Sequence, residues 1–266
     1  MSKKSSPIGV FDSGLGGLSI LQELALAMPA EDFIYLGDIA RLPYGTKSQQ
    51  VVAKYSNTCA NFLFEQGIKA LVVACNTATA MALPQLQSEF DIPVLGVVEP
   101  GVQACINFSS DKPVLVLATE GTVKSEAYLK EFRRQGFKNK VEQLHCPLLV
   151  PLAEEGWFDN PVTTEVIRTY LSTLSMNDFG LILLGCTHYP LLKESFKKVL
   201  GKDFPILHGA KVLAQQIRDL LASKDLLQEN THKRKITFFS TDQVKASFPI
   251  LTALFKDPVS FSTVDL

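Results

Sequence analysis

Short apolar runs alternate with segments of helical periodicity along nearly the whole chain, and no other feature limits the fold as strongly. Residues 8–11, 33–36 and 70–74 are apolar runs of strand length. An apolar stripe at helical spacing fills 18–28, and Ser48 is suited to cap a second helix before the third run. Because strands that alternate with helices build parallel sheets covered by helices, the pattern predicts an α/β protein.

The alternation continues toward the end of the chain. Further strands are expected at 93–98, 113–118, 141–145, 180–184, 235–239 and 258–262, and further helices over about 122–135, 161–175, 191–199, 210–222 and 243–255. Gly136 is suited to stop one of these helices and Pro161 to open another. Pro84 disturbs the helical pattern that follows residue 75, because proline lacks the N–H group that an interior position donates.

Two segments resemble each other. "LVVACNTA" (71–78) and "LILLGCTHYP" (181–190) each join an apolar run to a cysteine and then to polar residues that include threonine. Chance also places a cysteine after an apolar strand, but the shared threonine and the matching offset favour an internal repeat. We therefore expect two pseudo-symmetric lobes with an active site in the cleft between them. The first comprises 7–98 plus 211–266, and the second comprises 99–210.

Composition excludes several classes of protein. The 266 residues are 46% hydrophobic and 20% charged, as is usual for a globular protein. The formal net charge of −1 gives no basic field to recruit nucleic acid. No apolar run approaches the roughly 20 residues that span a bilayer, so we expect a cytoplasmic protein without a membrane partner. The general prevalence of two-fold symmetry makes a homodimer the expected assembly.

The five cysteines fall into two groups. Their odd number and the lack of CxxC spacing argue against a disulfide framework and against a zinc cage. We interpret Cys59, Cys105 and Cys146 as packing residues, since buried cysteine behaves as a small hydrophobe. Cys75 and Cys186 differ, because each ends an apolar run and is followed by hydrogen-bonding side chains.

The first glycine-rich stretch is "FDSGLGGLS" (11–19), which follows the first expected strand. Ligands of parallel sheets bind beyond the carboxyl ends of the strands, so Asp12 and Ser13 are candidates for a site. The glycines give neither a dinucleotide fingerprint nor a Walker A loop. A carboxylate ligand suits the loop better than a polyphosphate, which Asp12 would repel.

A second loop, "YLGDIARLPYGTKS" (35–48), follows the next strand. Asp38 stands at the end of the strand, and Pro43, Tyr44 and Gly45 favour a turn. Taken alone, this segment fits a surface turn before a helix as well as a loop that closes over a small ligand.

The two cysteines each have an acid–base partner nearby. His188 follows Cys186 by two residues, and Asp12 lies near Cys75 if the first and third strands are neighbours. A nucleophilic hydrolase needs only one thiol, and a redox pair needs two thiols close enough to bond. A racemase needs two proton-transfer groups on opposite faces of one carbon, which is what two facing lobes supply. The repeat therefore favours racemisation.

Four motifs carry a resemblance to a known family. "GVFDSGLGGLS", "GDIARLPYGTKS", "VVACNTATA" and "LLGCTHYPLL" closely resemble the glutamate racemases, which are cofactor-independent enzymes that supply D-glutamate for bacterial peptidoglycan. "ATEGTVKSEAY" (118–128) and "CPLLVPLAEEG" (146–156) are similar to the second lobe of that family. The resemblance is strong over about 7–210.

The resemblance implies roles for particular residues. Cys75 and Cys186 correspond to the two catalytic acid–base residues, with Asp12 assisting the first and His188 the second. The implied substrate contacts are Asp12, Ser13, Pro43, Tyr44, Gly45, Asn76, Thr77, Thr187 and His188. Asp38 and Glu154 match possible assisting acids. The resemblance implies glutamate as the ligand and neither pyridoxal phosphate nor a metal.

Two alternatives remain at the level of sequence. Aspartate racemases share the plan with two cysteines, so the substrate is less firmly indicated than the reaction. A non-catalytic, two-lobed amino-acid-binding protein would use Ser13, Asn76, Thr77 and Thr187 as polar contacts and leave the cysteines as packing. Asp12 and His188 have no purpose in that second alternative.

Overall fold

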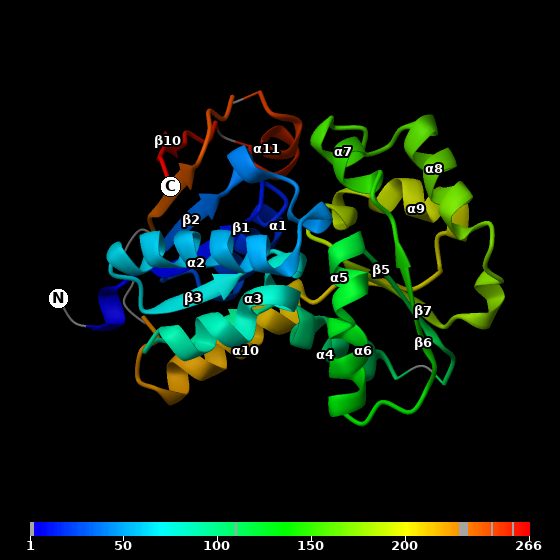
Figure 1. Ribbon diagram of the computed structural model, residues 1–266, viewed down its shortest axis with the longest axis horizontal. Helices are drawn as coiled ribbons and strands as arrows, with labels where there is room; N and C mark the ends of the chain where they lie inside the picture. The colour runs from blue at the N-terminus through cyan, green and yellow to red at the C-terminus, as the bar shows by residue number, and fades with distance from the viewer. Residues whose placement is uncertain (1–2, 110, 229–233, 246, 257) are drawn as a thin grey trace.

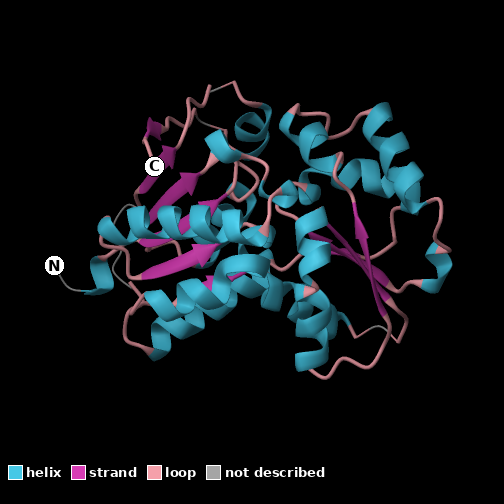
Figure 2. Ribbon diagram, in the orientation of Figure 1, coloured by secondary structure: helices cyan, strands magenta, loops and turns pink. Residues whose placement is uncertain are grey.

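The computed structural model describes residues 3–109, 111–228, 234–245, 247–256 and 258–266, and its strands form two parallel sheets (Figure 1). The first sheet contains, in spatial order, β10 (Ser262–Thr263), β9 (Ile236–Ser240), β2 (Phe33–Gly37), β1 (Ile8–Asp12), β3 (Ala70–Val73) and β4 (Val94–Gly96). The second contains β6 (Val141–His145), β5 (Val114–Ala118), β7 (Leu181–Gly185) and β8 (Ile206–Leu207). Helices flank both sheets (Figure 2), which confirms the predicted α/β class.

The two sheets repeat one strand order. In the first sheet, β1 lies between β2 and β3, and β4 follows β3; in the second, β5 lies between β6 and β7, and β8 follows β7. The strand that precedes Cys75 and the strand that precedes Cys186 therefore occupy equivalent places. The internal similarity of 71–78 and 181–190 thus reflects a repeated α/β unit.

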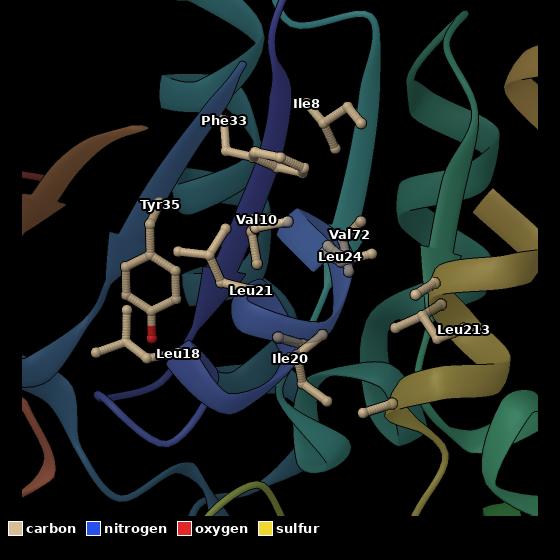
Figure 3. Packing of buried hydrophobic residues seen from close by; sticks show 14 of the residues in the cluster. Ile8, Val10, Leu18, Ile20, Leu21, Leu24, Phe33, Tyr35, Val72 and Leu213 are labelled. Atoms are coloured by element: carbon tan, nitrogen blue, oxygen red, sulfur yellow. The ribbon is translucent and has the colours of Figure 1, made fainter. Parts of the chain in front are cut away.

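Two layers of helices cover the first sheet. The helices of this part of the chain are α1 (Leu18–Ala27), α2 (Gln49–Glu65), α3 (Asn76–Glu89), α10 (Ala210–Ser223) and α11 (Pro249–Leu254). On one face, Leu21 and Leu24 of α1 pack with Leu213 of α10 over Val10 and Val72 (Figure 3). On the other face, α2 and α3 enclose a second apolar cluster. Because both faces are buried, the central strands are almost wholly apolar.

The second sheet is covered in the same way. Its helices are α4 (Val98–Phe108), α5 (Glu120–Ser125), α6 (Ala127–Arg134), α7 (Leu149–Glu154), α8 (Pro161–Leu171) and α9 (Lys193–Leu200). Apolar residues of α4 and α6 cover one face, and apolar residues of α7, α8 and α9 cover the other. As predicted, Cys59, Cys105 and Cys146 lie within these hydrophobic clusters.

The structure corrects two predicted helices. The helix expected over 122–135 is divided into α5 and α6 at Glu126, whose φ is +57°. The Ser125 hydroxyl donates to Thr122 O and accepts from Ala127 N, and these local bonds compete with helix continuation. The helix expected over 243–255 reduces to α11, which begins at Pro249, since proline is suited to the first position of a helix; residue 246 lies outside the described residues.

Other boundaries shift by less. The strand expected at 258–262 consists of Ser262 and Thr263 alone, the helix expected over 161–175 ends at Leu171, and the strand expected at 93–98 ends at Gly96, two residues before α4 begins. In contrast, α3 continues through Pro84. Its buried residues Ala78, Ala82 and Leu86 pack in the cluster on the sheet, and that burial outweighs the hydrogen bond that proline removes.

A buried ion pair joins distant segments at the end of the first sheet where β3 begins. Lys69 Nζ lies 2.5 Å from Glu31 Oε2, and the two side chains are 2% and 1% exposed. Lys69 also donates to the carbonyl oxygens of Lys4 and Leu226, and Glu31 accepts from the backbone of Gln228. Burial lowers the pKa of Lys69, and its bonds to Glu31 oppose that shift.

Removing one charge of this pair leaves the other uncompensated in a buried place. Lys69→Met should therefore lower the free energy of unfolding by about 3–5 kcal/mol in urea denaturation. The matched control is Lys140→Met, which removes the exposed partner of Glu142 and should change the free energy of unfolding by less than about 0.5 kcal/mol. Equal effects of the two substitutions would contradict a stabilising role for the buried pair.

Candidate active site

Polar residues from both sheets meet beyond the carboxyl ends of β1, β3 and β7. In the first sheet, β1 pairs directly with β3, and Phe11 lies opposite Val73. Asp12 and Cys75 each follow shortly after this pair, so they come close together. The expected proximity of Asp12 to Cys75 depended on the first and third strands being neighbours, and the structure confirms that these strands pair.

Both cysteines line one small cavity. It offers about 20 Å³ to the centre of a water-sized sphere, which is room for about one water molecule. Its lining residues are Ser13, Leu42, Pro43, Tyr44, Gly45, Cys75, Asn76, Thr77, Thr119, Val150, Cys186, Thr187 and His188. The structure thus brings together the predicted substrate contacts around the two thiols, except for Asp12, which lies behind this lining.

Cys75 occupies the N-cap position of α3. Its Sγ accepts from Ala78 N at 3.4 Å and donates to Ser13 Oγ at 3.5 Å. Burial raises the pKa of Cys75 to about 12, and the negative charge of Asp12 adds to the shift, while the bonds to Ser13 and Ala78 reduce it. Cys75 therefore rests as the thiol at neutral pH.

Asp12 is fully buried and connects the two sheets. Its Oδ2 accepts from Gly14 N at 3.1 Å, and its Oδ1 accepts from Thr187 Oγ1 of the second sheet at 3.3 Å. Burial raises the pKa of Asp12, although the charge of His188 and backbone bonds from Gly17 and Gly14 oppose the shift. A Cβ at Gly17 would lie 2.5 Å from Asp12 Cβ, so only glycine allows this approach.

Cys186 faces a histidine that is held by a carboxylate. His188 Nδ1 lies 3.8 Å from Cys186 Sγ, and His188 Nε2 lies 2.5 Å from Glu154 Oε1. Burial alone would lower the pKa of His188, but its contacts with Cys186 and Glu154 raise that pKa well above the usual value. These two contacts therefore favour the protonated imidazole beside the sulfur.

Asp38 holds the loop that forms one wall of the cavity. It accepts from Tyr44 Oη at 2.5 Å and from Thr241 Oγ1 at 2.8 Å. The Tyr44 hydroxyl is thus engaged by Asp38, and Gly45 packs against Thr119. Neither Asp38 nor Glu154 lines the cavity. Glu154 contacts His188, which lies beside Cys186, whereas Asp38 contacts Tyr44.

Sequence reasoning missed the residues that meet α3 from the second sheet. Thr77 Oγ1 lies 2.9 Å from Thr119 Oγ1 and 3.2 Å from Thr122 Oγ1, where α5 stands beside α3 (Figure 1). Tyr128 donates to Asn76 Oδ1 at 2.6 Å. A signal was present, because Thr119 directly follows the strand expected at 113–118, in the same position relative to its strand as the other site residues.

The described part of the chain contains no metal centre beside this site. Among those residues, no group of three or more His, Cys, Asp or Glu side chains is arranged to hold a metal ion. All five cysteines are free and buried. Across the same residues, none of the helices has the length and apolar composition that crossing a bilayer requires.

Comparison with known proteins agrees with the motifs. The family described as Asp/Glu/Hydantoin racemase matches residues 8–217. A glutamate racemase from Geobacter metallireducens is 45% identical over 241 residues, which is 91% of this chain and 89% of that protein.

Solved structures extend the similarity to the fold. Glutamate racemase RacE1 from Bacillus anthracis aligns with a TM-score of 0.92 at 37% identity, covering 99% of this chain and 98% of that one. The glutamate racemase from Francisella tularensis, solved with D-glutamate, aligns with a TM-score of 0.90 at 34% identity, covering 98% of each chain. The resemblance found in the four motifs is confirmed, and the chain belongs to the Asp/Glu/Hydantoin racemase family.

Proposed function

We propose that the protein interconverts L-glutamate and D-glutamate, with one of Cys75 and Cys186 removing the α-proton and the other delivering a proton to the opposite face of the α-carbon. The observation that carries this proposal is that two thiols, from equivalent strands of two sheets, line one cavity. Relatives that align over nearly the whole chain are glutamate racemases, and one of them was solved with D-glutamate. The aspartate racemase alternative has less support, because the similar aspartate racemase structure from Picrophilus torridus shares only 18% identity.

The proposed reaction uses one sulfur as base and the other as acid. A thiolate takes the α-proton, and the electron pair of the broken C–H bond remains on the α-carbon and its carboxylate. The thiol on the opposite face then delivers its proton to that carbon, which inverts the configuration. The next turnover in the reverse direction exchanges the roles. Neither pyridoxal phosphate nor a metal enters these steps.

The neighbours of each sulfur then have distinct tasks. His188, held by Glu154, exchanges a proton with Cys186, while Asp12 assists Cys75. The carbanion is stabilised by N–H groups at the start of α3 and after β7, in a site from which water is largely excluded. Ser13, Asn76, Thr77 and Thr187, together with the Pro43–Gly45 loop, hold the two carboxylates and the amino group of glutamate.

Substrate entry requires the two lobes to separate. Pockets for small ligands usually have volumes of about 300–1,000 Å³, whereas this cavity accommodates about one water. We assign 7–98 plus 211–266 to one lobe and 99–210 to the other, with the site in the cleft between them. Opening the cleft breaks the hydroxyl contact between Thr77 and Thr119.

We place the reaction in the cytoplasm of a bacterial cell, where D-glutamate is consumed in peptidoglycan synthesis. Free, buried cysteines suit a reducing compartment. A homodimer remains the predicted assembly.

Without added cofactor, the purified protein should convert L-glutamate into a racemic mixture. The reaction can be monitored by the loss of the circular dichroism signal of L-glutamate. With L-aspartate at the same concentration, the rate should be much lower. Faster racemisation of aspartate would favour the aspartate-type alternative. Binding of glutamate without change of configuration would favour the non-catalytic amino-acid-binding protein.

Replacing either thiol should nearly abolish turnover. Cys75→Ser and Cys186→Ser should each lower kcat by about 10²- to 10⁴-fold, because a hydroxyl is a much poorer base than a thiol at neutral pH. The matched control is Cys105→Ala, which changes a buried cysteine in the cluster between α4 and the second sheet and should leave kcat within a few-fold. Wild-type turnover by either serine variant would refute the two-base assignment.

A further inference from the structure

A buried tyrosine outside the cavity reaches the residue that follows Cys75. Tyr128 belongs to α6, against the second sheet, and is 1% exposed. Its hydroxyl donates to the amide oxygen of Asn76, the first residue of α3, at 2.6 Å. Asn76 lines the cavity that holds both cysteines, whereas Tyr128 does not; it faces a separate small cavity behind Asn76 and Cys186.

The ring of Tyr128 is fixed by the second sheet. A Cβ at Gly185 would lie 2.8 Å from Tyr128 Cε2, and a Cβ at Gly101 would lie 3.3 Å from Tyr128 Cε1. Two positions without side chains thus make the space that the ring fills. Burial first, and then the nearby Cys105 and Cys186, raise the pKa of Tyr128. The phenol therefore keeps its proton and remains able to donate a hydrogen bond to Asn76.

This bond engages the oxygen end of the Asn76 amide. An asparagine side chain has one oxygen that accepts and one NH₂ group that donates. Because the oxygen is engaged by Tyr128, the NH₂ group is the end available to an anionic ligand. If the amide turned over, its oxygen would oppose a substrate carboxylate and repel it.

We propose that Tyr128 is a positioning residue, which orients the Asn76 amide so that its NH₂ group donates to a carboxylate of the bound amino acid. The proposal rests on the proposed function, since it names a contact of the same site. It also gives the second lobe a role in arranging the first: the Cys75 side of the site is complete only when Tyr128 has docked against Asn76.

A double-mutant cycle tests this coupling. Tyr128→Phe keeps the ring and removes only the hydroxyl, and it should lower kcat/KM for L-glutamate by about 10-fold, mainly through KM. Asn76→Ala should lower kcat/KM at least as much. In the Asn76→Ala background, Tyr128→Phe should then lower kcat/KM by less than about two-fold. The control Tyr170→Phe removes a hydroxyl that accepts from Leu148 N, far along the chain from Asn76, and should leave kcat/KM within about two-fold.

Two outcomes would overturn the proposal. The first is an unchanged kcat/KM in Tyr128→Phe. The second is an equal loss from Tyr128→Phe in the presence and in the absence of the Asn76 side chain, which would mean that the hydroxyl does not act through Asn76. Thermal unfolding of each variant separates a folding defect from a positioning effect. The same double-mutant cycle can also be measured through the dissociation constant of D-glutamate for each variant, which does not depend on turnover. Failure of the wild type to racemise would therefore refute the proposed function, while the binding cycle still decides the role of Tyr128.

Discussion

The site exists only where the ends of two sheets meet, and the hydrogen bonds that cross this junction are its central constraint. Thr187 of the second sheet donates to Asp12 of the first, and Tyr128 donates to Asn76. Both bonds are buried, so each would leave an unsatisfied polar group if the sheets docked differently. The repeated strand order places Cys75 and Cys186 beyond the carboxyl ends of equivalent strands, β3 and β7. The two hydrogen bonds hold these strand ends close together.

The two halves of the site are alike in backbone and unlike in electrostatics. Cys75 has a serine hydroxyl and a buried carboxylate beside it, and its pKa is raised to about 12. Cys186 has beside it the imidazole of His188, whose pKa is raised by its contacts with Cys186 and Glu154. The Cys75 side thus favours a protonated sulfur, and the Cys186 side favours a cationic imidazole. An approximate repeat thus carries different chemistry on its two sides, which suits the proposed reaction, in which one side removes a proton and the other supplies a different one.

The sequence was sufficient for the parts that depend on local pattern. Buried strands are almost wholly apolar, so their positions and the cysteines that follow β3 and β7 could be predicted from the chain. The contacts across the junction could not, because Thr119 and Tyr128 meet α3 only through tertiary packing. Glu154 was suggested by resemblance alone, since it lies on the short helix α7, which no periodicity marks. The break at Glu126 depends on hydrogen bonds of a single serine, which an apolar stripe does not reveal.

The two-thiol mechanism is tested most directly by the early hydrogen exchange of L-glutamate in D₂O, measured separately for each enantiomer by NMR. If different sulfurs serve the two faces of the α-carbon, the first D-glutamate formed carries deuterium, while the L-glutamate that remains keeps its protium. Equal early exchange in both enantiomers, or D-glutamate that retains the original proton, would show that one group serves both faces and would contradict the mechanism.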